Sequence, residues 1–435
     1  MNLDPHPPAE LFADNLHASL SDPALSSMTF LNEIANKYPD AVNFAPGRPY
    51  EGFFDIEQIH RYLRRFERYL ADERGLNPEE VRRTLFQYGR TKGVIHELVA
   101  KNLATDEGFT VDPDSIVVTV GCQEAMYLAL RALRRDENDV LLVISPAYAG
   151  IVGAARLAEM RIVQVEGGDT GVDLDELTKA IRRARKDGLR PRACYLVPDF
   201  ANPSGLTIDL DTRRGLVALA AAEGLLLLED NPYRIFNGSA ERLPTLKGLD
   251  PGGHVVQLGS YAKTGMPGAR IGFAVADQPV VDRNGRRIGL LADELAKIKS
   301  MLTVNTSPIA QAVIAGRLLE HQHSLVNANH REIAHYRANL NHMVTALERC
   351  FGGSEDIDWR VPTGGFFLVM RVPFTATDAV LRRSAEEFGV LWTPMRHFYT
   401  GKAADHHIRL SFSSVDLGSI DVGVNRLSGL VGALS

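Results

Sequence analysis

Between residues 60 and 275, short apolar runs alternate with segments of helical periodicity. The runs are rich in Val, Leu and Ile, and they read "SIVVTVG", "VLLVISP", "RACYLVPDF", "GLLLLEDN", "HVVQLGSY" and "ARIGFAVAD". Strands that are apolar along their whole length are typical of a parallel sheet whose two faces are both covered by helices. The alternation therefore predicts an α/β fold with a large, mostly parallel sheet.

The rest of the chain predicts a second, smaller domain. A helical region from residue 290 to about 350, broken at "VNTSP", leads into "DWRVPTGGFFLVMRV", a helix, "GVLWTPMRHFY" and "HHIRLSFS". This mixture is typical of an α+β domain, which the N-terminal segment would complete. Because 435 residues exceed what one hydrophobic core serves, we expect an N-terminal segment at 1–58, a large domain at 59–315 and a small domain at 316–435.

Composition and charge exclude several classes of function. The formal net charge of -6 argues against a nucleic-acid surface, and no run of about 18 apolar residues could span a bilayer. The first residues have neither a basic start nor an apolar run, so we expect a cytoplasmic protein. Three scattered cysteines and the spacing of the histidines offer no metal site.

Polar residues and glycines follow several of the apolar runs. In an open α/β sheet, ligands bind beyond the carboxyl ends of the strands, so we expect these residues to converge on one site. They are Gly121, Gln123, Tyr148, Asn202, Asp230, Tyr233, Ser260 and Lys263.

The segment "LGSYAKTGMPGARIGF", which starts at residue 258, places one lysine among small residues. Such surroundings predict that backbone and a bulky group approach Lys263 closely. The small residues are Ser260, Ala262, Thr264, Gly265 and Gly268.

Asp230 ends the apolar run "LLLLED" and is expected to be partly buried. Taken alone, it could be a helix cap or a core hydrogen-bonding group. Together with Tyr233 and Lys263 it meets the requirements of pyridoxal phosphate, because a carboxylate keeps the ring nitrogen protonated while a lysine forms the Schiff base.

The phosphate of such a cofactor needs its own site. The run "TVGCQEAMYLAL" predicts a strand, a turn and a helix, whose first N–H groups at Gly121, Cys122 and Gln123 would face an anion. Ser260 and Arg270, on either side of Lys263, add a hydroxyl and a guanidinium suited to phosphate oxygens.

Seven segments, in this order, resemble the fold-type I, class I/II aminotransferases from about residue 30 to 430. They are "FQYGRTKG", "TVGCQEA", "SPAYAG", "PDFANPSG", "LLEDNPY", "GSYAKTGMPGARIG" and "IRLSFS". The resemblance implies an aspartate aminotransferase-like fold that binds pyridoxal phosphate. It also implies that Lys263, Asp230 and Tyr233 are catalytic.

The same resemblance implies a role for each remaining site residue. Asn202 and Tyr233 would hydrogen-bond the ring oxygen, Tyr148 would stack on the ring, and Ser260, Arg270 and the Gly121 turn would hold the phosphate. Tyr88 would reach the phosphate from the neighbouring subunit of a homodimer, as would the loop at Asn305 and Thr306. Arg409 would bind the substrate carboxylate, with Asn202, Gly47 and Arg48 beside the substrate.

The resemblance predicts transfer of an amino group between an amino acid and a 2-oxo acid. "NFAPGRPYEG", "KSMLTVNTSPIAQ" and "GVLWTPMRHFY" are similar to aminotransferases of natural-product pathways, particularly the 3,5-dihydroxyphenylglycine transaminase group. The alternatives are a pyridoxal-phosphate enzyme that catalyses elimination, replacement or carbon-carbon bond formation, and a non-enzymatic sensor of the cofactor.

Aromatic residues near these motifs predict an aromatic or large apolar substrate. The residues are Tyr50, Phe53, Phe54, Phe200, Trp392, Phe398 and Tyr399. Three further cations, Arg48, Arg90 and Arg396, could meet a second anionic group, but structural ion pairs are the favoured interpretation.

Overall fold

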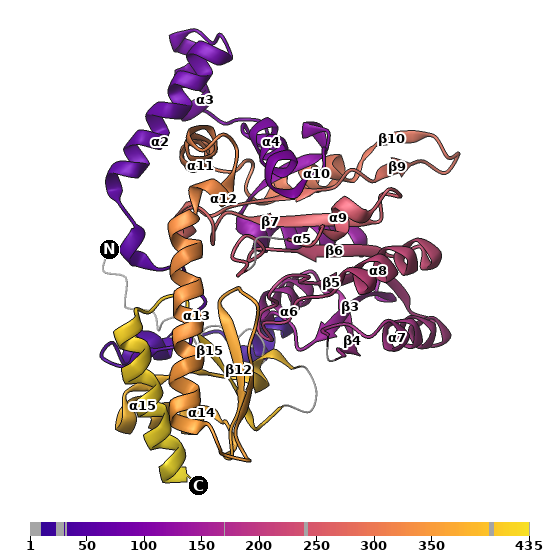
Figure 1. The fold of residues 1–435 in the computed structure, drawn as a ribbon. Helices are drawn as coiled ribbons and strands as arrows, with labels where there is room; N and C mark the ends of the chain where they lie inside the picture. Colours follow the sequence, from indigo (N-terminus) through magenta and orange to yellow (C-terminus); the bar gives the residue numbers. More distant parts are fainter. Residues whose placement is uncertain are drawn as a thin grey trace, which may run out of the picture.

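The computed structural model describes residues 10–22, 30, 33–168, 170–238, 242–399 and 404–434. A large sheet with helices on both faces occupies one side of the molecule, and a smaller sheet with long helices lies beside it (Figure 1). Among the described residues, no helix is both long and apolar enough to cross a membrane.

The large sheet has seven strands in the order β2-β8-β7-β6-β5-β3-β4. All neighbouring pairs are parallel except those of β8, which is antiparallel to both β2 and β7. The predicted mostly parallel sheet is therefore confirmed. The strands are β2 (Ile116–Val120), β3 (Asp139–Ser145), β4 (Arg161–Glu166), β5 (Arg190–Leu196), β6 (Leu226–Asp230), β7 (Val255–Ser260) and β8 (Ile271–Val275).

Two sets of helices cover the two faces of this sheet. One apolar cluster joins the sheet to α5 (Gly121–Leu133), α6 (Ala149–Leu157) and α10 (Leu291–Leu302). A second cluster joins it to α7 (Leu174–Lys186), α8 (Leu210–Glu223) and α9 (Leu246–Leu249). The apolar strands are thus buried from both sides.

The smaller sheet has the strand order β11-β12-β15-β14. Its strands are β11 (Asp358–Arg360), β12 (Phe367–Arg371), β14 (Thr393–Pro394) and β15 (His407–Ser411). The helices packed with it are α13 (His330–Phe351), α14 (Asp378–Arg383) and α15 (Leu417–Leu434). The N-terminal segment joins this unit, because β1 (Val42–Asn43) pairs in parallel with β13 (Val390–Leu391).

A helical arm extends at the top of Figure 1. It consists of α2 (Ile56–Arg68) and α3 (Pro78–Phe86), packed against α11 (Pro308–Glu320) and followed by α4 (His96–Glu107). The predicted break at "VNTSP" lies between α10 and α11. The described residues also form β9 (Pro279–Val281), β10 (Arg287–Leu290), α12 (Leu325–Ala328) and several short 3₁₀ or π-helical turns. The domain boundaries at 58/59 and 315/316 stay predictions.

Candidate active site

A cavity of about 390 Å³ lies at the carboxyl ends of β5, β6 and β7, between the large sheet, the N-terminal segment and the small domain. Most of the predicted site residues line it, from segments far apart in the sequence; Gly121 and Tyr88 do not. The lining includes Gly47, Arg48, Cys122, Gln123, Tyr148, Asn202, Asp230, Tyr233, Ser260, Lys263, Arg270 and Arg409.

Gly121 contributes from behind the lining, at the start of α5. Its φ of +71° lies in the left-handed region, and a Cβ there would lie 2.4 Å from Nη2 of Arg270. The glycine thus allows the turn and brings a guanidinium against the N-terminus of α5, where backbone N–H groups lack helical partners. Arg270 itself has a left-handed φ of 53°.

Asp230 is buried at the end of β6 and faces the cavity. Tyr195 Oη donates a hydrogen bond to its Oδ2 at 2.7 Å, and Cys122 Sγ donates to Oδ1 at 3.6 Å. Burial raises the pKa of Asp230 to about 6, against the opposing effects of these two bonds and the charge of Lys263. Asp230 therefore makes the core hydrogen bonds that the alternative interpretation expected. A cationic partner in the cavity would stabilise its charged form further.

Lys263 follows β7, and its Nζ donates to the carbonyl oxygen of Gly47 at 2.6 Å. Burial, together with the positive charges of Arg409, Arg270 and Arg48, lowers the pKa of Lys263 to about 8. With this pKa, about a tenth of the Lys263 amine is neutral at pH 7 and about half at pH 8. Only the neutral amine can act as nucleophile or base.

The small residues around Lys263 have different reasons for being small. A Cβ at Gly265 would lie 3.0 Å from Ile314 Cδ1 and from the carbonyl oxygen of Tyr261. At Gly268 a Cβ would meet open space, so the expected close approach is wrong there. Ala262 and Ser260 line the cavity, as expected.

Arg409 on β15 reaches the cavity from the small domain and is buried. Its Nη1 donates to Asn202 Oδ1 at 2.5 Å, and its Nη2 donates to the carbonyl oxygen of Ala45 at 2.6 Å. The guanidinium carbon lies 4.2 Å from the ring centre of Phe367 and 4.8 Å from that of Phe398.

No carboxylate among the described residues pairs with Arg409, and its buried Nε has no partner among them. Burial lowers the pKa of this group to about 10. Its charge is thus available to a bound carboxylate.

Two tyrosines complete the walls of the cavity. Tyr148 precedes α6, and burial raises its pKa to about 12. Burial also raises the pKa of Tyr233, which a hydrogen bond with Asn202 partly offsets. Both phenols are therefore neutral and able to donate hydrogen bonds at physiological pH.

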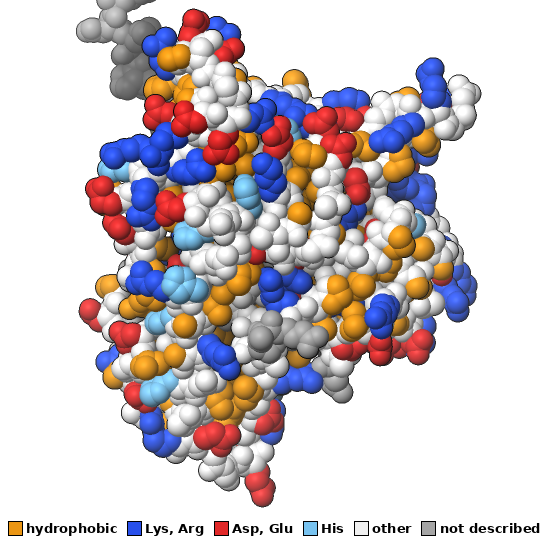
Figure 2. Space-filling model, turned by 45° about the horizontal axis from the view of Figure 1, so that its top comes forward, with side chains coloured by type: hydrophobic (Ala, Val, Ile, Leu, Met, Phe, Trp, Pro, Cys, Tyr) orange, Lys and Arg blue, Asp and Glu red, His pale blue; other side chains and the backbone are white. Residues whose placement is uncertain are grey.

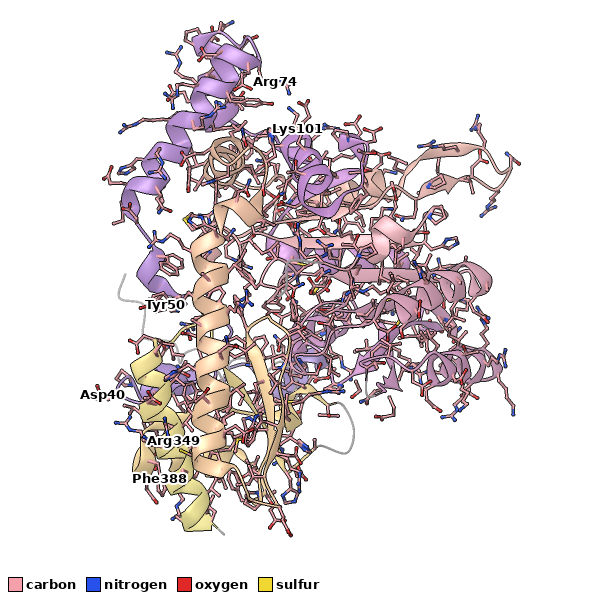
Figure 3. The ribbon with its side chains drawn as sticks, in the orientation of Figure 1. Asp40, Tyr50, Arg74, Lys101, Arg349 and Phe388 are labelled. Atoms are coloured by element: carbon pink, nitrogen blue, oxygen red, sulfur yellow. The ribbon has the colours of Figure 1, made fainter. Side chains whose placement is uncertain are left out.

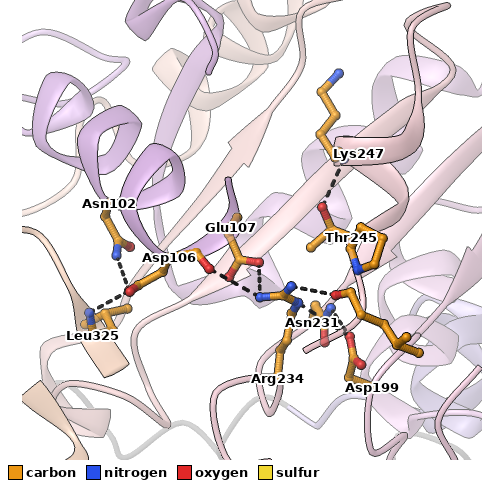
Figure 4. A network of polar contacts seen from close by, with 12 residues as sticks. Asn102, Asp106, Glu107, Asp199, Asn231, Arg234, Thr245, Lys247 and Leu325 are labelled. Atoms are coloured by element: carbon orange, nitrogen blue, oxygen red, sulfur yellow. Dashed lines mark hydrogen bonds and ion pairs between the residues drawn. The ribbon is translucent and has the colours of Figure 1, made fainter. Parts of the chain in front are cut away.

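A buried polar network supports the loop that follows β6 (Figure 4). Asn231 Nδ2 donates to Asp199 Oδ2 at 2.7 Å, and the fully buried Arg213 donates to Asp199 Oδ1 at 2.6 Å. Arg234 pairs with Glu107 at 2.5 Å. The network fixes the loop between Asp230 and Arg234 on either side of Tyr233.

The predicted aromatic lining is wrong in most of its members. Phe398 lines the cavity, and so does Phe367, which the prediction did not include. Tyr50 and Phe53 instead pack on His335 of α13, where Figure 3 labels Tyr50, and Trp392 lies in the core of the small domain. The favoured ion-pair interpretation is confirmed for Arg90, which pairs with Asp114 at 2.7 Å.

The family model for aminotransferases of class I and II matches residues 67–427. The chain belongs to this family.

Curated relatives and solved structures are similar to this chain over most of its length. The (S)-3,5-dihydroxyphenylglycine transaminase of Amycolatopsis orientalis is 51% identical over 424 residues, which cover 98% of this chain and 95% of that protein. The 2-aminoadipate transaminase of Thermus thermophilus is 30% identical, with 89% of each chain covered. The kynurenine aminotransferase of Pyrococcus horikoshii has a TM-score of 0.81 at 26% identity, with 97% of each chain covered.

The predicted membership of the class I/II aminotransferases and the predicted fold are thus confirmed. This aminotransferase uses pyridoxal phosphate. The cavity fits that cofactor. The buried carboxylate of Asp230 suits a protonated ring nitrogen, the Arg270 guanidinium against Gly121 suits a phosphate, and Lys263 offers a reactive amine. The alternative reaction outcomes are not favoured by these similarities.

Proposed function

We propose that this aminotransferase transfers an amino group between an aromatic or large apolar amino acid and a 2-oxo acid in natural-product biosynthesis. The observation that carries the proposal is that Lys263, Asp230 and Arg409 surround one cavity. The similarity to (S)-3,5-dihydroxyphenylglycine transaminase supports an aryl substrate, as do the rings of Phe367 and Phe398 beside Arg409.

Lys263 is proposed as the residue that moves the protons. Bound pyridoxal phosphate withdraws the electrons left when a bond at the substrate's α-carbon breaks. Lys263 Nζ, as a neutral amine, would take the proton from the substrate's α-carbon and would hold it for return to the reactants. Its lowered pKa supports this role, because the free amine then exists near neutral pH.

The other residues would hold the reactants in place. Asp230 would keep a proton on the ring nitrogen, and Tyr148 would stack on the ring. Asn202 and Tyr233 would bind the ring oxygen. Ser260, Arg270 and the N–H groups of Gly121, Cys122 and Gln123 would bind the phosphate.

Arg409 would bind the substrate carboxylate through two parallel hydrogen bonds. Arg48, exposed at the cavity edge, and the carbonyl group of Gly47 would lie beside the substrate. Arg409 donates hydrogen bonds to the neutral oxygens of Asn202, Ala45 and Thr393, which a carboxylate would displace or share.

A homodimer with shared active sites is proposed on the basis of an exposed apolar surface. Five large apolar or aromatic side chains near the ends of α3 and α10 are exposed: Phe86, Tyr88, Met301, Leu302 and Val304. Figure 2, which brings the top of the molecule forward, shows hydrophobic side chains among the charged ones on this face. Tyr88, 83% exposed and outside its own cavity, would complete the neighbour's phosphate site.

In the loop next to this surface, Asn305 and Thr306 differ in whether they can contact a second subunit. Thr306 is buried and donates to the carbonyl oxygen of Val118 in its own subunit, so Asn305 is the residue left to reach a neighbour.

A cytoplasmic location, consistent with three free thiols, also stays a proposal.

A half-reaction tests the proposed function. The enzyme with bound cofactor is mixed with an aromatic amino acid alone, and the products are measured by absorbance and mass spectrometry. Transamination predicts stoichiometric pyridoxamine phosphate and 2-oxo acid. Release of ammonia, or of a side-chain fragment, with the cofactor still in its aldehyde form would indicate the elimination alternative.

A further inference from the structure

Lys299 on α10 forms a buried ion pair that lies outside the cavity. Its fully buried Nζ donates to Glu124 Oε2 at 2.8 Å and to Thr303 Oγ1 at 2.8 Å. Thr303 Oγ1 in turn donates to Glu124 Oε1 at 2.7 Å. The three side chains close a ring of charge-assisted hydrogen bonds, which compensates for burying the ammonium group.

One side of this ring belongs to the proposed phosphate helix. Glu124 lies in the first turn of α5, directly after Gln123, and its Oε2 also accepts the N–H of Val120 at 2.6 Å. A carboxylate in that turn would repel a phosphate bound at the same helix end. Lys299 neutralises this charge and is packed against α5 through α10.

The other side of the ring holds the loop from 303 to 306, on the exposed apolar surface. Thr303 begins the loop, and Thr306 ends it with its hydrogen bond to Val118 of β2. Between them Val304 has a φ of +61° and is 47% exposed. A β-branched residue keeps a left-handed backbone only where its surroundings impose it, so the two anchored ends hold the loop in a strained shape.

We propose that Lys299, Glu124 and Thr303 are positioning residues that hold the loop 303–306 against α5 and thereby couple cofactor binding to the pairing of two copies of this chain. The proposal rests on the proposed function, in which the N-terminus of α5 binds the cofactor phosphate and the loop faces a second copy. Occupation of the phosphate site would fix the first turn of α5, and the ring would transmit that restraint to the surface loop.

The test is the effect of pyridoxal phosphate on dimer dissociation. Sedimentation of the apoenzyme, with and without saturating pyridoxal phosphate, gives the two dissociation constants. In the wild type the cofactor should tighten the dimer by at least about tenfold, within the usual range of coupling between linked sites. In Thr303→Val, which keeps the ion pair but loses the bridging hydroxyl, the factor should fall by about threefold or more, and the coupling that remains would come from the direct contact of the neighbour's Tyr88 with the phosphate.

Matched variants separate coupling from general destabilisation. Thr303→Ser keeps the hydroxyl and should keep the wild-type factor. Lys299→Met should lower the factor at least as much as Thr303→Val does. Lys247→Met removes another buried lysine, which pairs with Asp277 at 2.7 Å and donates to Val255 at the start of β7, the end opposite the cavity. This control should lower stability and leave the coupling unchanged.

A Thr303→Val variant with the wild-type coupling factor would overturn the proposal, even if Lys299→Met does not fold. Loss of coupling in Lys247→Met would also overturn it. A third contradicting result would be that the wild-type chain binds the cofactor without any change in the dimer dissociation constant. A wild-type chain that binds no pyridoxal phosphate would contradict the proposed function itself, which keeps the two failures distinct.

Discussion

Three ionisable side chains at the cavity have electrostatic environments suited to different tasks. Burial holds the pKa of Asp230 up at about 6 and that of Lys263 down at about 8, while Arg409 has no carboxylate partner among the described residues. The sequence predicted Asp230 and Lys263 because they lie at or just after the ends of apolar strands, whereas Arg409 was predicted from the family resemblance alone. Tyr195 and Phe367 escaped prediction, because only the packing of distant segments brings them to Asp230 and Arg409.

Arg409→Lys should weaken substrate binding, because an ammonium keeps the charge but cannot form two parallel hydrogen bonds. The loss of one hydrogen bond to a charged group predicts a fall in kcat/KM of about 10- to 100-fold, carried mainly by KM. Steady-state kinetics with an aromatic amino acid measures it. Arg396→Lys, at an exposed position outside the cavity lining, should match the wild type. Unchanged kinetics in Arg409→Lys would move the carboxylate site elsewhere, with Arg48 the next candidate.

The apoenzyme should lose stability as pH rises through the titration of Asp230. Its pKa rises from 3.8 to about 6 on folding, so the folded state binds more protons than the unfolded state across that window. The free energy of unfolding should therefore fall between about pH 4 and pH 6 by up to about 3 kcal/mol from this group, and stay level above it. Urea denaturation of wild type and Asp230→Asn should give profiles that diverge in that window. Parallel profiles would show that Asp230 is not the buried acid described.

At the scale of elements, strand ends and one glycine turn place the site. The six apolar runs each contain a strand, but β4 at the sheet edge was not among them, because its exposed ends leave it no continuous apolar run. The antiparallel direction of β8 was not predicted either. Residues 261–270, which connect β7 to β8, are too few for a parallel crossover, so β8 runs antiparallel to β7. That short return places Lys263 and Arg270 on one loop beside α5.

Gly121→Ala should damage this arrangement at two levels. A left-handed φ costs an alanine about 1 kcal/mol, and the added Cβ would also displace Arg270 from the helix end. Gly188→Ala is the matched control, since Gly188 has a φ of +77° with open space around its Cβ position. Both variants should lose similar stability in urea, but only Gly121→Ala should bind pyridoxal phosphate more weakly, by about tenfold or more. Equal cofactor affinity in the two variants would remove Gly121 from the phosphate site.

At the scale of the whole molecule, two copies of the chain are expected to build each site. The sequence indicated the role of Tyr88 through family resemblance, and in one chain this residue is 83% exposed and does not line its own cavity. Periodicity and strand patterns describe one chain, so they carry no information on such sharing.

Mixing two inactive variants tests whether sites are shared. Tyr88→Ala and Lys263→Ala should each lack activity as homodimers. A hybrid contains one fully intact site, formed by Lys263 of one chain and Tyr88 of the other. Random exchange should therefore recover about a quarter of wild-type activity, because about half of the dimers are hybrids. No recovery after verified exchange would indicate that each chain completes its own site.

The central claim is that Lys263 binds the cofactor and moves the protons, and borohydride reduction tests it most directly. In the wild type, reduction should fix pyridoxal phosphate on Lys263, located by peptide mass spectrometry. Lys263→Ala should fold, retain the cofactor through its phosphate contacts, carry no label after reduction and show no turnover. Label on another lysine, such as the buried Lys92, or wild-type turnover by Lys263→Ala, would contradict the account.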